Sequence, residues 1–282
     1  MADSRVNQSR FFPLGQNGEI VNDTSSTHVS EQLCHLIVDY FVRQFPDAEA
    51  LKSVYIRGSV ARGTFVPGIS DLDAFAVLQD GYAGPDLEAD KTLLTKIKQT
   101  LPGVTEIELT HCHESEVIGN PLGVWPFFIK TQSLNIWGTD YAHQLADYKP
   151  GCQIMGEAMW LPNRLLEYQQ RLNDDKWKGR EAFLCEWIMK AVVRAAFELT
   201  METEKRYTRD LDLCYQVFSR HYPEYSEMCH QAMVWAVSPD NDTRAHLQLV
   251  EKFSLWIERK LARILSDNLV DVSRYDLAAK GS

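Results

Sequence analysis

The chain has 282 residues, of which 45% are hydrophobic and 24% charged, a composition that excludes a disordered, low-complexity or collagen-like protein. It contains no run of 18 apolar residues and no long apolar stretch near its first residue, which excludes a spanning helix and a signal peptide and predicts a cytoplasmic protein without membrane partners. The net charge of −10 disfavours nucleic acid as a partner and favours a small or cationic substrate.

The first half of the chain alternates segments typical of strands and helices. A helical pattern begins near Ser25 or Ser26, where a hydroxyl can cap a helix, and stops at Pro46. The elements expected after it are strands at Ser53–Ile56 and Asp71–Leu78, a helix at 86–101, a strand at Val104–Thr110, and a helix leading into a strand within Trp125–Trp137. This order predicts a mixed α/β sheet.

The second half of the chain contains few segments typical of strands. Helix-period stretches cover about 161–173, 179–204, 209–221 and 243–266, separated by short breaks rich in Pro and Asp. We therefore expect an α+β fold with two domains. An N-terminal α/β domain with a mixed sheet spans 1–150, and a C-terminal all-helical domain spans 151–282.

A glycine-serine turn followed by two aspartates carries the chemical signal. Gly58 and Ser59 follow a predicted strand and open a short helix, where backbone N–H groups and a small hydroxyl can cradle a phosphate. After a gap of eleven residues come Asp71 and Asp73, which are two apart on a strand and project from one face. Two carboxylates so close repel each other unless a cation lies between them, and such hard oxygen ligands suit Mg²⁺.

The next predicted strand offers a third carboxylate. Glu106 and Glu108 share one face of that strand, and either residue could complete the site. His111, Cys112 and His113 look like a metal cluster at first sight. On a strand, however, Cys112 points away from the two histidines, so we expect no zinc site there. The six cysteines include no C-x-x-C and are expected to be reduced buried thiols.

The pattern Gly58-Ser59, a gap, Asp71-Leu72-Asp73 and a later acid resembles the nucleotidyltransferases of the DNA polymerase β superfamily. The segment from Gly58 to Thr64, together with Ser70 to Asp73, is most similar to the aminoglycoside adenylyltransferase branch. The chain departs from the superfamily pattern at Arg57, where an apolar residue is usual. The motif covers about residues 54–110.

The resemblance implies that domain 1–150 is catalytic and that the helical domain 151–282 closes over substrate and nucleotide. It also implies a reaction and a set of site residues. AMP passes from ATP to a hydroxyl of a small, cationic acceptor such as an aminoglycoside antibiotic, and pyrophosphate leaves, a reaction that implies antibiotic resistance. Two Mg²⁺ ions are held by Asp71, Asp73 and the third acid, for which Glu108 is slightly preferred over Glu106. The residues expected at the nucleotide are Gly58, Ser59, Arg62, Ser70 and, from the helical domain, Arg209.

The sequence allows two roles each for Arg62, for Arg209 and for a group of three glutamates. Arg62 either faces the nucleotide or pairs with a nearby acid, and Arg209 either binds the triphosphate or is a solvated neighbour of a capping Thr208. Glu198, Glu202 and Glu204 form either a solvated helix face or a docking surface for a polycationic acceptor. Transfer to a protein side chain or an RNA end, and a catalytically silent nucleotide-binding module, are the alternative functions. The acceptor hydroxyl, the preferred nucleoside triphosphate and the oligomeric state are not encoded in any recognisable pattern.

Overall fold

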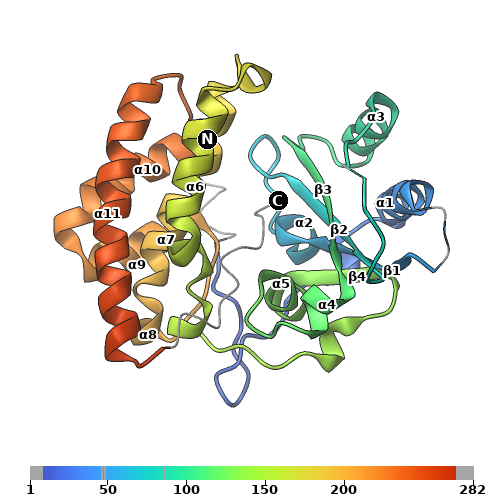
Figure 1. The fold of residues 1–282 in the computed structure, drawn as a ribbon, viewed down its shortest axis with the longest axis horizontal. Coiled ribbons are helices and arrows are strands. Elements are labelled where there is room, and N and C mark those ends of the chain that lie inside the picture. Colours follow the sequence, from blue (N-terminus) through green and yellow to red (C-terminus); the bar gives the residue numbers. More distant parts are fainter. Residues whose placement is uncertain (1–8, 46, 48, 86, 271–282) are drawn as a thin grey trace. The chain divides into compact units, whose positions relative to one another are not determined.

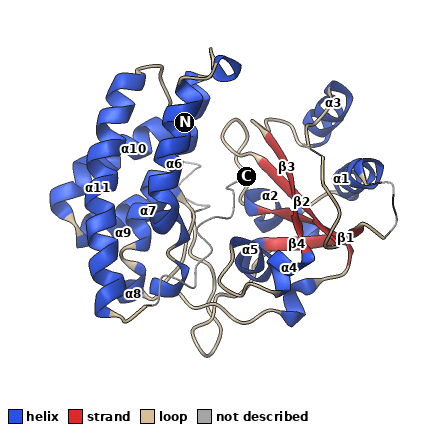
Figure 2. Cartoon of the chain, in the orientation of Figure 1, coloured by secondary structure: helices blue, strands red, loops and turns tan. Residues whose placement is uncertain are grey.

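The computed structural model describes residues 9–45, 47, 49–85 and 87–270, and these residues divide into two compact units. Within the described residues, one unit is formed by 20–148 and the other by 9–19 together with 149–270. The first unit contains a four-stranded sheet with helices, and every regular element of the second is helical (Figures 1 and 2). This confirms the expected fold class.

The sheet of the α/β unit has the strand order β3-β2-β1-β4. Its strands are β1 (Leu51–Arg57), β2 (Leu72–Leu78), β3 (Ile107–His113) and β4 (Ser133–Gly138). β1 pairs antiparallel with both β2 and β4, and β2 pairs parallel with β3, so the sheet is mixed as predicted. β2 and β3 are joined by a crossover that contains α3 (Lys91–Thr100).

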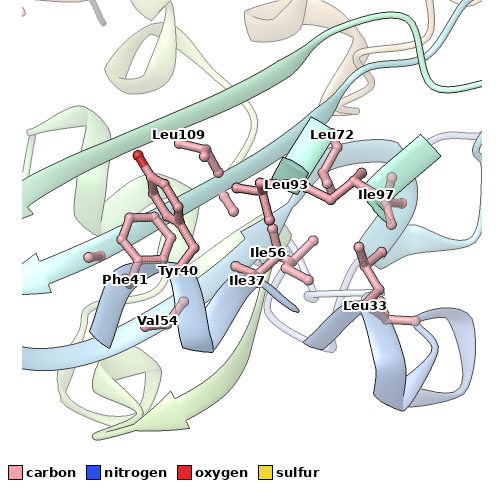
Figure 3. Close-up of a cluster of buried hydrophobic side chains, with 14 of the residues drawn as sticks. Leu33, Ile37, Tyr40, Phe41, Val54, Ile56, Leu72, Leu93, Ile97 and Leu109 are labelled. Carbon is pink, nitrogen blue, oxygen red and sulfur yellow. The ribbon is translucent and has the colours of Figure 1, made fainter. Parts of the chain in front are cut away.

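One face of this sheet packs against α1 (Glu31–Gln44) and α3. Figure 3 shows the contact: Ile37 and Phe41 of α1 lie against Val54 and Ile56 of β1, all of them essentially inaccessible to solvent. Leu72 of β2, Leu109 of β3 and the α3 residues Leu93 and Ile97 complete the same cluster. Burial of this face fixes the register of the strands, because a slip of one residue would turn every side chain to the opposite face.

The opposite face is covered by α4 (Glu114–Ile118) and α5 (Val124–Gln132). Tyr55 of β1 stacks on Phe75 of β2, with ring centroids 5.1 Å apart, and Trp125 of α5 lies against Phe75 at 5.0 Å. Cys112 is buried in the same cluster. The expected helix and strand within Trp125–Trp137 are therefore confirmed as α5 and β4, and Cys112 lies on the apolar side of its strand, as the sequence indicates.

The first helix begins later than the sequence predicts. Ser25 caps a short 3-10 turn at Ser26–His28, and Ser30 accepts a hydrogen bond from Leu33 N to cap α1, which begins at Glu31. Two serine caps lie within six residues, and the sequence pattern does not tell which one begins the long helix. The expected stop at Pro46 lies outside the described residues.

The helix expected at 86–101 begins later, at Lys91, because Asp90 accepts a hydrogen bond from Leu93 N as its cap and residues 87–90 are not helical. The strand expected at Val104–Thr110 is displaced to Ile107–His113.

The second unit is a bundle of helices. They are α6 (Gly156–Leu172), α7 (Glu181–Glu198), α8 (Met201–Glu204), α9 (Leu211–His221), α10 (Ser226–Val237) and α11 (Thr243–Asp267). The shorter 3-10 turns of the chain's later part are at Tyr141–Gln144, Cys152–Ile154, Asp175–Trp177 and Pro223–Tyr225. None of the described helices is both long and apolar enough to cross a bilayer.

Two features of the bundle differ from the sequence expectation. The single stretch 179–204 is divided into α7 and α8, with Leu199 and Thr200 between them. The helix α10 was not predicted, because apolar residues lie on most of its sides and a regular polar face is lacking. Its small buried residues Cys229, Ala232 and Ala236 let it pack closely against its neighbours.

Candidate active site

A row of three charged side chains crosses the sheet at the start of β2. Arg57 of β1 is paired with Asp73 of β2, and Asp73 is paired with Glu108 of β3. Paired residues on neighbouring strands point to the same face, so all three side chains lie on the side covered by α4 and α5. The row begins where the apolar stack of Tyr55 and Phe75 ends.

Arg57 joins the two acids of this row. Its Nη2 atom lies 3.6 Å from Oδ1 of Asp73 and 3.5 Å from Oε1 of Glu108. Its guanidinium also lies over the ring of Phe128 from α5, 4.6 Å from the ring centroid. In the sequence, Arg57 is only a departure from the motif. Its position beside the acids follows from the pairing register of the strands, and a single sequence does not show that register.

Asp73 occupies an environment that disfavours its charge. Its side chain is 14% exposed, and burial raises its pKa from an ordinary 3.8 to about 8. The Arg57 guanidinium acts in the opposite direction, whereas the negative charges of Asp71 and Glu108 raise the pKa further. Asp71, Asp73 and Glu108 are thus close enough to influence each other electrostatically.

The register distinguishes the two candidates for the third carboxylate. Glu108 lies within β3 directly beside Asp73, and its Oε1 atom is buried and accepts no hydrogen bond from any described residue. Glu106 is exposed and precedes the strand, and its carbonyl oxygen accepts a hydrogen bond from Leu72 N at 2.9 Å. The geometry therefore brings Glu108, and not Glu106, into the row with Asp73.

The glycine-serine turn lies against the same aspartate. Gly58 has a φ of +76°, and a Cβ atom added there would lie 3.1 Å from Oδ2 of Asp73. Both the backbone conformation and the close approach therefore require glycine. Oγ of Ser59 is buried and has no hydrogen-bond partner among the described residues. The turn opens the five-residue helix α2 (Gly58–Arg62), as predicted.

Two further residues of the predicted nucleotide site have local partners. Arg62 is 3% exposed and donates two hydrogen bonds to the carboxylate of Asp23, at 2.7 and 3.1 Å. An acid partner was one of the two roles that the sequence left open for Arg62. Oγ of Ser70 accepts a hydrogen bond from Val66 N at 2.9 Å and so holds the loop before Asp71.

Arg209 lies in the helical unit within a buried network of charges. Its Nη2 atom donates to Oε1 of Glu157 at 3.1 Å, and Arg164 lies 3.4 Å from the other oxygen of Glu157. Burial alone would raise the pKa of Glu157, but Arg164, Arg209 and Arg194 together lower it to about 2. The Thr208 hydroxyl accepts a hydrogen bond from Asp210 N, a local contact of the kind that the capping alternative expected.

The three glutamates that the sequence grouped together do not form one solvated face. Glu198 is 4% exposed and accepts a hydrogen bond from Ala158 N at 2.8 Å, and burial raises its pKa well above the ordinary value. Glu202 and Glu204 are occupied by Lys205 and His221, respectively. The proposed docking surface for a cationic acceptor is therefore wrong for Glu198, because the packing of α6 against α7 covers it.

The described residues contain no group of three or more His, Cys, Asp or Glu side chains already arranged around a metal position. The donor set of the row nevertheless fits a divalent cation. Asp71, Asp73 and Glu108 supply hard oxygen ligands, and the buried Oε1 of Glu108 lacks a hydrogen bond within the described part of the chain. Arg57 supplies the positive charge that Asp73 and Glu108 face. A hollow of about 290 Å³ on the helical unit, near Gln169 and Glu181, contains none of these residues.

No model of a known protein family matches the chain, and no curated protein matches it. Among solved structures, the chain is similar to the spectinomycin adenyltransferase AAD(9) from Enterococcus faecialis, determined with ATP and spectinomycin. The likeness covers 81% of this chain and 99% of that chain, with 12% sequence identity and a TM-score of 0.43.

Proposed function

We propose that the protein is a Mg²⁺-dependent nucleotidyltransferase that transfers AMP from ATP to a hydroxyl of a small cationic acceptor, such as an aminoglycoside, and releases pyrophosphate. One observation carries the proposal: three carboxylates lie together, with Asp71 and Glu108 both acting on Asp73, beside a glycine-serine turn where an added Cβ at Gly58 would lie 3.1 Å from Asp73. Metal-dependent transfer of a nucleotide needs both parts, a cluster of hard oxygen ligands and a turn that admits phosphates.

The carboxylates would bind the divalent cation through their oxygens. When bound, Mg²⁺ would neutralise phosphate charge and lower the pKa of the acceptor hydroxyl. Asp73 is buried beside Asp71 and Glu108, so the repulsion among these carboxylates favours a cation over a proton as pH rises. Two ions are expected from the resemblance.

The turn would orient the phosphates of ATP. Gly58 lacks a side chain that would block approach, and the unpartnered Oγ of Ser59 is a hydrogen-bond donor for a phosphate oxygen. Arg209 and Ser70 remain proposed nucleotide contacts. For Arg209 this would require it to bind phosphate while it stays paired with Glu157.

Glu108 is proposed as the general base as well as a ligand. Its carboxylate would take the proton from the acceptor hydroxyl as the hydroxyl oxygen forms a bond to the α-phosphorus of ATP. The bond from the α-phosphorus to the bridging oxygen breaks, and that oxygen leaves with pyrophosphate. Glu106, exposed just before the same strand, is the alternative base.

The experiment is transfer of labelled AMP from ATP, with Mg²⁺, to a panel of aminoglycosides and related aminocyclitols. We expect pyrophosphate release and a labelled acceptor with at least one of them. Glu108→Gln should reduce kcat by about 100-fold or more, the usual contribution of a general base, while Glu106→Gln keeps most of the activity. If no small molecule accepts the label, the acceptor assignment is wrong. Label on a protein or RNA would instead support transfer to a macromolecule, although the net charge of −10 disfavours RNA.

A further inference from the structure

We propose that the guanidinium of Arg57 competes with a divalent cation for Asp73 and Glu108, and so sets how tightly this site binds metal. The inference rests on the carboxylate site of the proposed function. It concerns a residue that the motif does not include and for which the sequence indicates no role.

The contacts of Arg57 place its charge at the oxygens that a cation would use. The same Nη2 atom lies 3.6 Å from Asp73 and 3.5 Å from Glu108, so one nitrogen faces both acids. Oε1 of Glu108 is buried and accepts no hydrogen bond from a described residue. These distances are typical of ion pairs and too long for strong hydrogen bonds. The oxygens of both carboxylates can therefore still coordinate a divalent cation.

Arg57 is also held in this position. Its side chain is 13% exposed, its backbone is paired with Asp73 on one side and Ser133 on the other, and its guanidinium rests on the ring of Phe128. A cation over an aromatic face is stabilised further when water is excluded. The arginine therefore stays close to the acids instead of moving freely into solvent.

The charges of the three carboxylates and Arg57 indicate how many divalent ions the site can hold. Asp71, Asp73 and Glu108 carry three negative charges when all are ionised, and Arg57 with one divalent cation carries three positive charges. A second divalent ion would leave an excess of positive charge unless nucleotide phosphates arrived with it or Arg57 moved away. Without nucleotide, we therefore expect one divalent ion to bind weakly, because like charges a few ångströms apart repel strongly in a partly buried site.

The test measures Mn²⁺ binding without nucleotide, using the electron paramagnetic resonance signal of free Mn²⁺. Manganese suits carboxylate ligands as magnesium does. Arg57→Met keeps an unbranched stem over Phe128 and removes the charge, and it should lower the Kd for Mn²⁺ by at least about tenfold. Arg57→Lys, which keeps the charge, should stay within about threefold of the wild-type Kd. Arg43→Met, the same substitution on the exposed side of α1, is the matched control and should leave the Kd unchanged.

A second measurement, of thermal stability, tests the proposal even if Arg57→Met is less stable than the wild type. Without the guanidinium, the buried Oε1 of Glu108 loses the positive charge that faces it, so the variant should melt lower in chelator, and Mg²⁺ should raise its Tm more than it raises the wild-type Tm. If the variant is unfolded in chelator, Mg²⁺ should restore its circular dichroism spectrum. An Mn²⁺ affinity equal to wild type overturns the proposal, as does a destabilised variant that Mg²⁺ does not rescue.

The outcomes separate this inference from the proposed function. Nucleotide transfer by the wild-type protein together with an unchanged Mn²⁺ affinity in Arg57→Met would contradict only the role of Arg57. Tighter Mn²⁺ binding in Arg57→Met, without transfer to any acceptor, would support the competition and contradict the proposed reaction.

Discussion

At the residue scale, the site depends on a few side chains whose environment changes their chemistry. Asp73 is the clearest case, since burial and the neighbouring carboxylates raise its pKa to about 8 while Arg57 opposes the shift. A carboxyl group with so high a pKa is largely protonated at pH 7 in the absence of metal. Binding of a divalent cation must then release a proton, so metal affinity should rise with pH up to about 8.

The same shift predicts a pH-dependent effect of Asp73→Asn on stability. A raised pKa in the folded state contributes stability below the ordinary pKa of 3.8, and that contribution is lost as the pH rises through about 8. In metal-free buffer, the free energy of unfolding of the variant relative to wild type should therefore increase by about 5 kcal/mol between pH 4 and pH 8. Urea denaturation at the two pH values measures this. If the variant and the wild type differ in free energy of unfolding by the same amount at pH 4 and pH 8, the environment assigned to Asp73 is wrong.

The sequence predicted part of this site because its spacing is local. Gly58, Ser59, Asp71 and Asp73 follow one another along a strand, a turn and a second strand, so their proximity follows from chain order. The choice of Glu108 over Glu106 and the position of Arg57 depend on the register between strands. Packing of the buried faces sets that register over the whole sheet, and one sequence does not display it.

At the element scale, α6 and α7 are joined by buried charges near the first turn of α6. Glu157 lies in that turn, paired with Arg209 and Arg164, and the neighbouring Ala158 N donates to Glu198 of α7. The structure therefore gives Arg209 a clear role within the helical unit, whatever it contributes to nucleotide binding. An ion pair of this kind is costly to break from one side, because the partner's charge is left buried.

Glu157→Gln should therefore destabilise the protein by about 3 kcal/mol at pH 7. The pKa of Glu157 is lowered to about 2, so its contribution is present above the ordinary value of 4.5 and is lost as the pH falls through about 2. Chemical denaturation measures the loss. Glu167→Gln on the same helix, where the partner is Arg171 on a more exposed surface, is the control and should cost less than about 1 kcal/mol. Equal losses in the two variants would contradict the account.

Helices with a regular polar face were predicted from the sequence, because the face repeats with the helical period. A helix without such a face was not predicted. α9 and α11 begin and end within two residues of the expected positions. α10 has apolar residues on most sides, including the exposed Val234 and Val237, so its period is hidden. The break between α7 and α8 carries no Gly or Pro, and tertiary packing decides it.

At the scale of the whole molecule, the chain contributes to the helical unit twice. Residues 9–19 belong to that unit, the α/β unit follows from residue 20, and the chain returns to the helical unit at 149. Phe12 is 2% exposed, its backbone N–H donates to Tyr207 O at 2.9 Å, and its ring lies 5.1 Å from that of Tyr207. No sequence pattern predicts this contact, because it joins segments almost 200 residues apart and the early segment is short and irregular.

Phe12→Ala should therefore destabilise the helical unit, by about 3 kcal/mol for a buried aromatic ring. Hydrogen exchange resolved by peptide is the measurement, with faster exchange around Tyr207 and Cys214 and unchanged exchange in β2. Leu14→Ala, in the same segment but 40% exposed, should change exchange little. Faster exchange in β2 alone would contradict the assignment of residues 9–19 to the helical unit.

The most direct test of the central claim is pyrophosphate release by a double variant, Asp71→Asn with Asp73→Asn, compared with wild type in the presence of ATP, Mg²⁺ and an accepted small molecule. The claim predicts that the double variant folds, since repulsion between the carboxylates is relieved, and that its release of pyrophosphate falls to the level without enzyme. A folded double variant that still transfers AMP would show that these aspartates do not hold the catalytic cation.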